Sequence, residues 1–189
     1  MADLKGALDA LDAARGSPKE VRRAFSRFAD LTQRLTAAMR TDFSRAKGQT
    51  WDAASFPGWN KVTEFFKWLR NHDQHESPLR ISVHERRFYE RPDRPGELFS
   101  FEGTWTLADQ LTDKPPDGIT FTPLDQATGK PMPPAAPVRI EYQYLLQWPN
   151  EAARKRLQSI GTTDVHLLSA ACFAALSEYY TYFTDRINT

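Results

Sequence analysis

The chain has 189 residues, of which 40% are hydrophobic and 12% aromatic, so it can bury a substantial core and is expected to form one domain, 1–189. Its 25 basic and 24 acidic residues leave a formal net charge of +1, which argues against a protein that coats nucleic acid through bulk electrostatics. The single cysteine, Cys172, excludes a disulfide within one chain. No apolar segment approaches the length that crosses a bilayer, and no apolar leader follows a basic start, so we expect a cytoplasmic protein without a membrane partner.

Two helices are expected at the start of the chain. In residues 3–14, leucines recur at helical spacing. Ser17, Pro18 and Glu20 then have the pattern of an N-cap, a first helical residue and a capping-box glutamate. Apolar residues continue at steps of three or four, so the second helix is predicted to run to about Lys47.

A third helix is predicted from the aromatic-rich segment 59–69, whose apolar residues form one buried stripe. Pro78 disfavours helical geometry in the residue before it, so this helix should end near residue 75 or 76. Polar residues cluster at this helix end, and three of them are the candidate site residues: Arg70, Asn71 and His75.

Residues 79–148 change from helical to alternating periodicity. Apolar and polar residues alternate over 99–107 and 138–144, and a further strand is expected from residue 79 onward. We therefore predict a small antiparallel sheet of three or four strands, with one face laid on the helices. The proline-rich segment 114–137 is predicted to be a long loop inside this sheet.

Two more helices follow the sheet. Pro149 or Asn150 is expected to open a short helix, and Asp164 is expected to cap the last one. The predicted fold class is therefore α+β, with a helical bundle formed by 1–76 and 149–189 and a strand-rich insert at 79–148.

The helix-end cluster has a definite geometry if the helix is regular. Asn71 and His75 are one turn apart, so the amide can hold an imidazole nitrogen and select its tautomer. Arg70 lies about 140° around the helix from His75, so their side chains diverge. They can cooperate if the helix unwinds before His75, if the long arginine wraps around the helix, or if a second copy of the chain supplies the missing partner.

The sequence Arg70-Asn71 followed by His75 resembles the Arg-polar-x-x-x-His signature of the HEPN superfamily. The resemblance implies a HEPN-like helical bundle, interrupted here by the antiparallel insert, that forms a homodimer. It also implies a metal-independent endoribonuclease with an RNA substrate and no cofactor. By the same resemblance, Arg70 and His75 would line a cleft shared by two subunits, with Asn71 orienting them, and the biological setting would be a toxin–antitoxin pair or phage defence with a partner protein.

The proposed chemistry is reasonable for these residue types. A histidine with a pKa of about 6.5 can take the proton of a ribose 2′-hydroxyl, which then attacks the adjacent phosphorus. An arginine at the scissile phosphate stabilises the charge that develops in the transition state. The products would be a 2′,3′-cyclic phosphate and a 5′-hydroxyl, and DNA would not be cut because it lacks the 2′-hydroxyl.

Other interpretations of the same residues stay open. Arg70, His72 and His75 could stabilise the C-terminal end of the helix through its dipole and have no other role. A HEPN-like module could instead bind a protein or a nucleotide without cutting RNA. A metal site from His72, Asp73, His75 and His84 lacks a cysteine pair or a convincing acidic partner.

Two further groups of residues have ordinary structural explanations. The basic segment downstream is interleaved with acidic residues, which favours a solvated face over a phosphate-binding track. Its basic residues are Arg80, Arg86, Arg87, Arg91 and Arg94. His166, near the start of the last helix, is expected to be a partly buried helix residue and not a metal ligand.

Overall fold

The computed structural model describes residues 1–52, 56–75, 80–91, 94–107, 128–130, 136–148 and 150–188, with the side chains of 70–75 left out. Helices and strands follow one another along the chain in the order expected from its periodicity. They are α1 (Ala2–Ala13), the 3₁₀ turn η1 (Ala14–Gly16), α2 (Pro18–Lys47), α3 (Lys61–His75), β1 (Ile81–Arg91), β2 (Arg94–Leu107), β3 (Arg139–Leu146), α4 (Glu151–Ile160) and α5 (Val165–Asn188).

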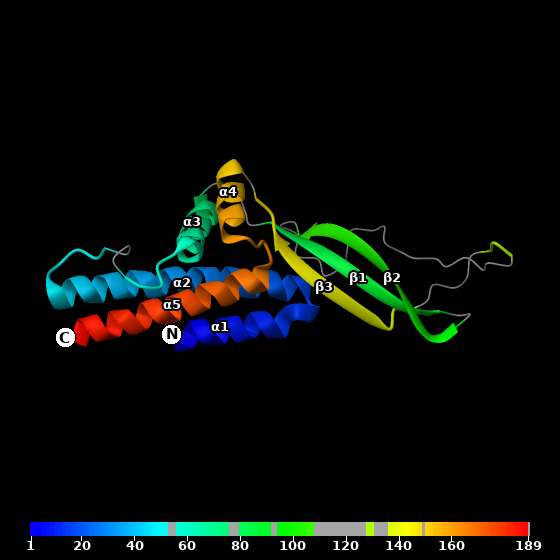
Figure 1. Ribbon diagram of the computed structural model, residues 1–189, viewed down its shortest axis with the longest axis horizontal. Helices are drawn as coiled ribbons and strands as arrows, with labels where there is room; N and C mark the ends of the chain where they lie inside the picture. Colours follow the sequence, from blue (N-terminus) through cyan, green and yellow to red (C-terminus); the bar gives the residue numbers. More distant parts are fainter. Residues whose placement is uncertain are drawn as a thin grey trace.

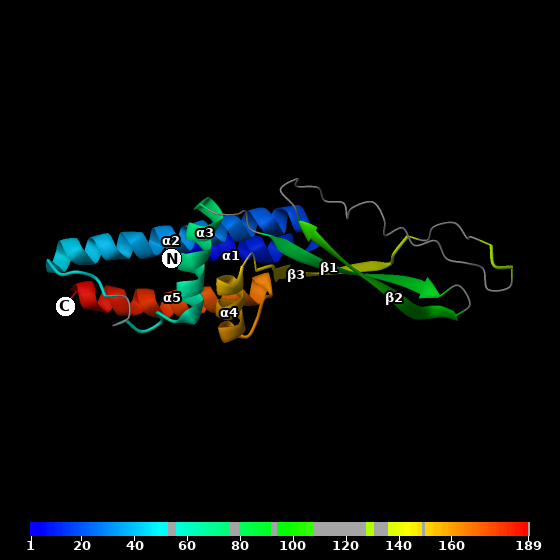
Figure 2. The same cartoon turned by 90° about the horizontal axis from the view of Figure 1, so that it is seen from above.

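The molecule is elongated, with helices at one end and the sheet at the other (Figure 1). The two long helices, α2 and α5, lie side by side, and α1 packs along both of them over part of their length (Figures 1 and 2). Helices α3 and α4 contact each other on another side of this pair. The sheet leaves the bundle at the end where η1 turns the chain from α1 into α2.

The long helix α2 begins and ends where its sequence predicts. Pro18 occupies the first helical turn, and Gly48 ends the helix in the left-handed conformation with φ +63°. The expected capping box is absent at its start, because the side chain of Ser17 makes no cap hydrogen bond. The backbone carbonyl of Ser17 accepts the first hydrogen bond of the helix, from the amide of Val21 (2.9 Å).

The core of the helical part is built around phenylalanines of α2 and α3. The ring of Phe66 packs edge-on against Phe25 and Phe28, with centroids 5.8 and 5.5 Å apart, and all three side chains are fully buried. Leu4 and Leu11 of α1 belong to the same continuous core. Burial of this apolar surface is what holds the short helices α1 and α3 in place.

The sheet has the strand order β2-β1-β3, with antiparallel pairing on both sides of β1. Because side chains alternate between the two faces, the register aligns apolar residues of all three strands on one face. Two aligned rows of this face join the helical core: Ile81, Leu107 and Leu146, and then Val83, Trp105 and Tyr144. The sheet is therefore attached to the bundle by its first rows, and the rest extends away from it (Figure 1).

At the other end of the bundle, the segment between α2 and α3 packs against α5. Trp51 stacks on Phe56 at 3.9 Å between centroids, and both rings contact Tyr179 of α5. Gly58 lies so close to α5 that a Cβ atom there would be 2.2 Å from the carbonyl oxygen of Ala175. The φ of Gly58 is +82°, so this residue satisfies both a steric and a conformational requirement.

The predicted α+β class is confirmed, since the described elements are helices and one small antiparallel sheet of three strands. The described strands β1, β2 and β3 lie between α3 and α4 along the chain. Most of the predicted loop 114–137 lies outside the described residues. Within the described part of the chain, no helix combines the length and apolar character that a membrane span requires.

Candidate functional site

Helix α3 carries the three candidate residues, and its start is well defined by local hydrogen bonds. The side chain of Asn60 accepts hydrogen bonds from the amides of Val62 (2.9 Å) and Thr63 (3.3 Å). The hydroxyl of Thr63 in turn accepts one from the amide of Asn60 (2.8 Å). This reciprocal cap satisfies donors that the first turn of a helix would leave free.

The helix continues without a break through His75, so Arg70, Asn71 and His75 all occupy its last two turns. Their side chains lie outside the described part of the structure. The backbone nevertheless removes one of the three ways in which Arg70 and His75 could cooperate, because the helix does not unwind before His75. In a regular helix the two Cα positions differ by about 140° of rotation and about 7.5 Å of rise.

Helix α4 packs beside α3 just before this cluster. It is capped by Asn150, whose side chain accepts a hydrogen bond from the amide of Ala153 (2.9 Å), and it ends at Gly161 with φ +89°. Its Arg156 places the guanidinium carbon 5.4 Å from the centroid of the Trp68 ring of α3. An aromatic ring at this distance attracts the cation, so the contact links the two helices.

His166 lies in the first turn of α5 and is 6% exposed. Asp164 caps this helix, because its Oδ1 accepts hydrogen bonds from the backbone amides of His166 (2.9 Å) and Leu167 (3.0 Å). The expected N-cap is therefore confirmed. The sequence predicts a partly buried helix residue at position 166. The structure buries His166 more deeply than that.

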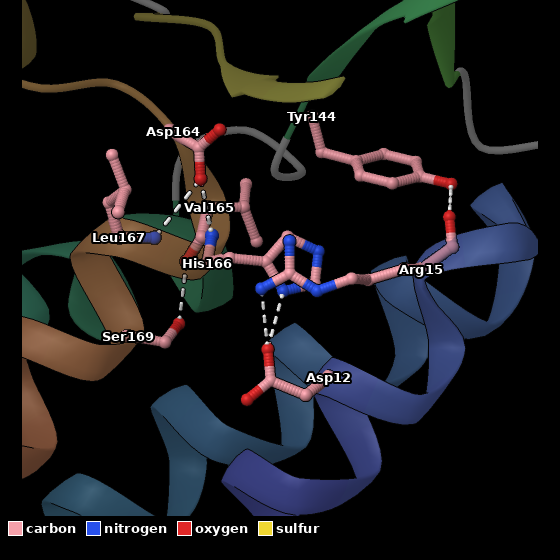
Figure 3. A network of polar contacts seen from close by, with 8 residues as sticks. All are labelled: Asp12, Arg15, Tyr144, Asp164, Val165, His166, Leu167 and Ser169. Carbon is pink, nitrogen blue, oxygen red and sulfur yellow. Dashed lines mark hydrogen bonds and ion pairs between the residues drawn. The ribbon is translucent and has the colours of Figure 1, made fainter. Parts of the chain in front are cut away.

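The imidazole of His166 lies between α1 and the sheet (Figure 3). Its Nδ1 is 3.3 Å from Oδ1 of Asp12, an oxygen that also accepts a hydrogen bond from Nη2 of Arg15 (2.8 Å). The ring of Tyr144 is 5.8 Å away between centroids, and its hydroxyl donates to the backbone carbonyl of Arg15 (2.8 Å). Within the described part of the chain, neither ring nitrogen of His166 makes a hydrogen bond of regular geometry.

Electrostatics keep this buried histidine neutral near pH 7. Burial lowers the pKa of His166, and the neighbouring Arg15 lowers it further, against the opposing effects of Asp164 and Asp12. Burial likewise raises the pKa of the Tyr144 hydroxyl, which stays protonated and acts as a donor. We regard this cluster as a joint that holds α1, the sheet and α5 together, because its imidazole is not accessible to a substrate.

This joint was not foreseen from the sequence. Tyr144 and Arg15 are 129 positions apart, and neither residue belongs to a recognisable motif. Only the alternation that placed Tyr144 on an inward face, together with the cap at Asp164, hinted that a polar group would be buried here.

The metal alternative gains no support. Among the residues whose side chains are described, no group of three or more histidine, cysteine, aspartate and glutamate side chains could hold an ion. His84 is exposed on β1, and the side chains of His72, Asp73 and His75 lie outside the described part. Cys172 is fully buried, and burial raises its pKa, as expected for a core residue and not for a nucleophile.

The arginines of β1 and β2 have carboxylate partners, and one of these carboxylates, Glu85, is buried. The pairs are Arg86 with Glu102 (3.1 Å), Arg87 with Glu85, and Arg91 and Arg94 with Glu97 (4.0 and 3.4 Å). A polyanion would have to compete with these carboxylates, so the sheet is a poor phosphate track.

Comparison with known proteins gives no assignment by similarity. No protein-family model matches the chain, and no curated protein or solved structure shows a significant match. The residues of α3 and the elements packed around them are therefore the basis for assigning a function.

Proposed function

We propose that the chain is a metal-independent endoribonuclease of the HEPN type, with a site at the C-terminal end of α3. His75 acts as the general base on the ribose 2′-hydroxyl, Arg70 binds the scissile phosphate, and Asn71 orients the imidazole. The observation that supports this proposal is the unbroken α3 helix, in which Asn71 and His75 are one turn apart. Cleavage by this route requires no cofactor.

The same helix supports a site made by two copies of the chain. Arg70 and His75 diverge by about 140° in one regular helix, so an arginine from a second copy can reach the phosphate held at His75. The proposed enzyme is therefore a homodimer. A cytoplasmic setting and an antitoxin or another defence protein as its partner belong to the proposal through the resemblance to the HEPN superfamily.

Labelled RNA incubated with the purified protein in excess EDTA tests the activity. We expect fragments that end in a 2′,3′-cyclic phosphate, and no cleavage of an oligonucleotide with a 2′-deoxyribose at the cut position. His75→Ala should abolish the products, while His84→Ala, which removes an exposed histidine of β1, should leave them unchanged. Cleavage that persists in the His75→Ala protein would remove His75 from the mechanism.

Mixing two inactive variants tests the shared site. In a heterodimer of the Arg70→Ala and His75→Ala proteins, one composite site keeps both native residues and the other keeps neither. If subunits exchange freely, we expect recovery of about a quarter of the wild-type activity, since half of the dimers are mixed and half of their sites are intact. A site contained within one chain would recover none.

A second candidate is a non-catalytic HEPN-like module that binds a protein or a nucleotide. The carboxylate pairing of the strand arginines favours it, because an RNA enzyme usually offers a longer basic surface. Absence of cyclic-phosphate products from a folded protein with intact dimers would support this module over the enzyme.

A further inference from the structure

Arg156 of α4 is a cation that the structure holds in one position. Its guanidinium lies over the ring of Trp68, and its side chain is exposed to solvent. No carboxylate pairs with it among the described residues. The neighbouring Arg154 differs in this respect, because Nη2 of Arg154 lies 2.5 Å from Oε1 of Glu151.

The position of Trp68 on α3 relates Arg156 to the candidate site. His75 follows Trp68 by seven residues, which is about two helical turns, so both positions lie on the same side of α3 and about 10.5 Å apart along its axis. Arg70 lies about 160° from Trp68, on the opposite side. Arg156 is therefore a cation of the same chain on the side of α3 where His75 lies.

We propose that Arg156 binds an RNA phosphate next to the scissile one and thereby positions the strand at His75. This inference rests on the proposed ribonuclease function. Arg156 meets α3 at Trp68, about two turns before His75, so we assign it as a positioning residue and not a catalytic one. A guanidinium fork held against an aromatic ring loses little conformational freedom when it binds a phosphate.

RNA binding can be measured without cleavage in a His75→Ala background, by anisotropy of a fluorescein-labelled single-stranded RNA at increasing salt concentrations. Arg156→Gln should weaken binding about 3- to 10-fold at 0.1 M salt and reduce the slope of log K against log salt by about 0.7, the contribution of one phosphate contact on a single strand. Arg156→Lys should keep the slope.

Lys155→Gln is the matched control, because it removes the same charge from the adjacent residue, on the side of α4 that faces solvent. It should change neither affinity nor slope. A purely structural role of Arg156 in packing α4 on α3 would lower the melting temperature and leave the salt slope intact. Equal slopes for the Arg156→Gln and Lys155→Gln proteins would overturn the inference.

Cleavage assays separate this inference from the proposed function. With His75 present, Arg156→Gln should raise KM for a long RNA and leave kcat close to the wild-type value. If the wild-type protein cleaves RNA but Arg156→Gln changes neither KM nor the salt slope, the role of Arg156 is refuted and the ribonuclease proposal stands. If Arg156→Gln reduces the salt slope but the wild-type protein does not cleave RNA, the ribonuclease proposal is refuted and the phosphate contact stands. A wild-type protein that does not bind RNA refutes both.

Discussion

The hydroxyl of Tyr144, on β3, donates a 2.8 Å hydrogen bond to the backbone carbonyl of Arg15, in the turn between α1 and α2. This bond joins the sheet to the bundle across 129 positions of the chain. It also anchors the residue whose guanidinium binds Asp12 beside His166. The attachment of the sheet therefore includes this part-buried polar contact as well as apolar burial.

Tyr144→Phe should test that contact. The phenylalanine keeps the buried ring and removes the donor from the carbonyl of Arg15, so we expect a loss of about 1 to 2 kcal/mol in the free energy of unfolding. Urea denaturation of both proteins measures the difference. Equal stability of the Tyr144→Phe and wild-type proteins would show that water replaces the lost bond.

Gly58→Ala should be strongly destabilising. The new Cβ atom would lie 2.2 Å from the carbonyl oxygen of Ala175 and 2.7 Å from the amide nitrogen of Tyr179, so α5 or the segment before α3 must shift. Together with the strain of a positive φ, we expect a loss of more than about 3 kcal/mol.

Gly161→Ala provides the comparison, because its φ of +89° imposes the same kind of strain and nothing lies within 4 Å of its Cβ position. Its cost should be only about 1 to 2 kcal/mol. Thermal or urea unfolding of the two variants gives the difference directly. Similar losses for both would mean that the contact between Gly58 and α5 relaxes at little cost.

The free energy of unfolding should decrease as the pH falls below about 6.5, the pKa of a histidine in the unfolded chain. Burial lowers the folded-state pKa of His166 most and Arg15 lowers it further, whereas Asp164 and Asp12 raise it. The ring of Tyr144 packs against the imidazole. The unfolded chain therefore binds the proton more readily. The free energy of unfolding is unaffected by this group above the unfolded pKa of about 6.5, and it declines as pH falls from there toward the lower folded-state value.

His166→Phe should reduce this acid-side decline, whereas substitution of the exposed His84 by glutamine should not. Urea titrations between pH 5 and 8 measure both proteins against the wild type. Identical pH profiles for the wild type and the His166→Phe variant would show that the imidazole is not a source of the acid sensitivity.

Glu85 should contribute more to the stability of the sheet than an exposed glutamate would. It is 3% exposed on the central strand and accepts a hydrogen bond from Nε1 of Trp105 (3.2 Å) and another from Arg87. Glu85→Ala leaves both donors without this acceptor, although Arg87 is partly exposed and can turn to water. We expect a loss of about 2 to 4 kcal/mol.

A double-mutant cycle with Trp105→Phe, followed by urea denaturation, isolates the indole contact. It should give a coupling energy of about 1 kcal/mol between Glu85 and Trp105. Additive effects would show that Trp105 contributes only through packing.

Local patterns alone predicted most of the elements. Helix ends are set locally: proline at residue 18 and glycine at residues 48 and 161 act through their backbone conformation, and Asn150 and Asp164 act through hydrogen bonds to residues within a few positions. The alternation around Trp105 and Tyr144 predicted inward faces for the same reason, since each side-chain direction depends only on its own strand. The helix that carries Arg70, Asn71 and His75 was likewise predicted, and the structure describes it as α3 (Lys61–His75).

Contacts between distant segments were decided only by the tertiary structure. The strand order β2-β1-β3, the approach of Gly58 to α5, the burial of His166 against Asp12 and the placement of Arg156 over Trp68 all join residues far apart in the chain. Such pairs form because the whole chain must bury its apolar surface and pair its buried polar groups at once, and no local pattern encodes which partners meet.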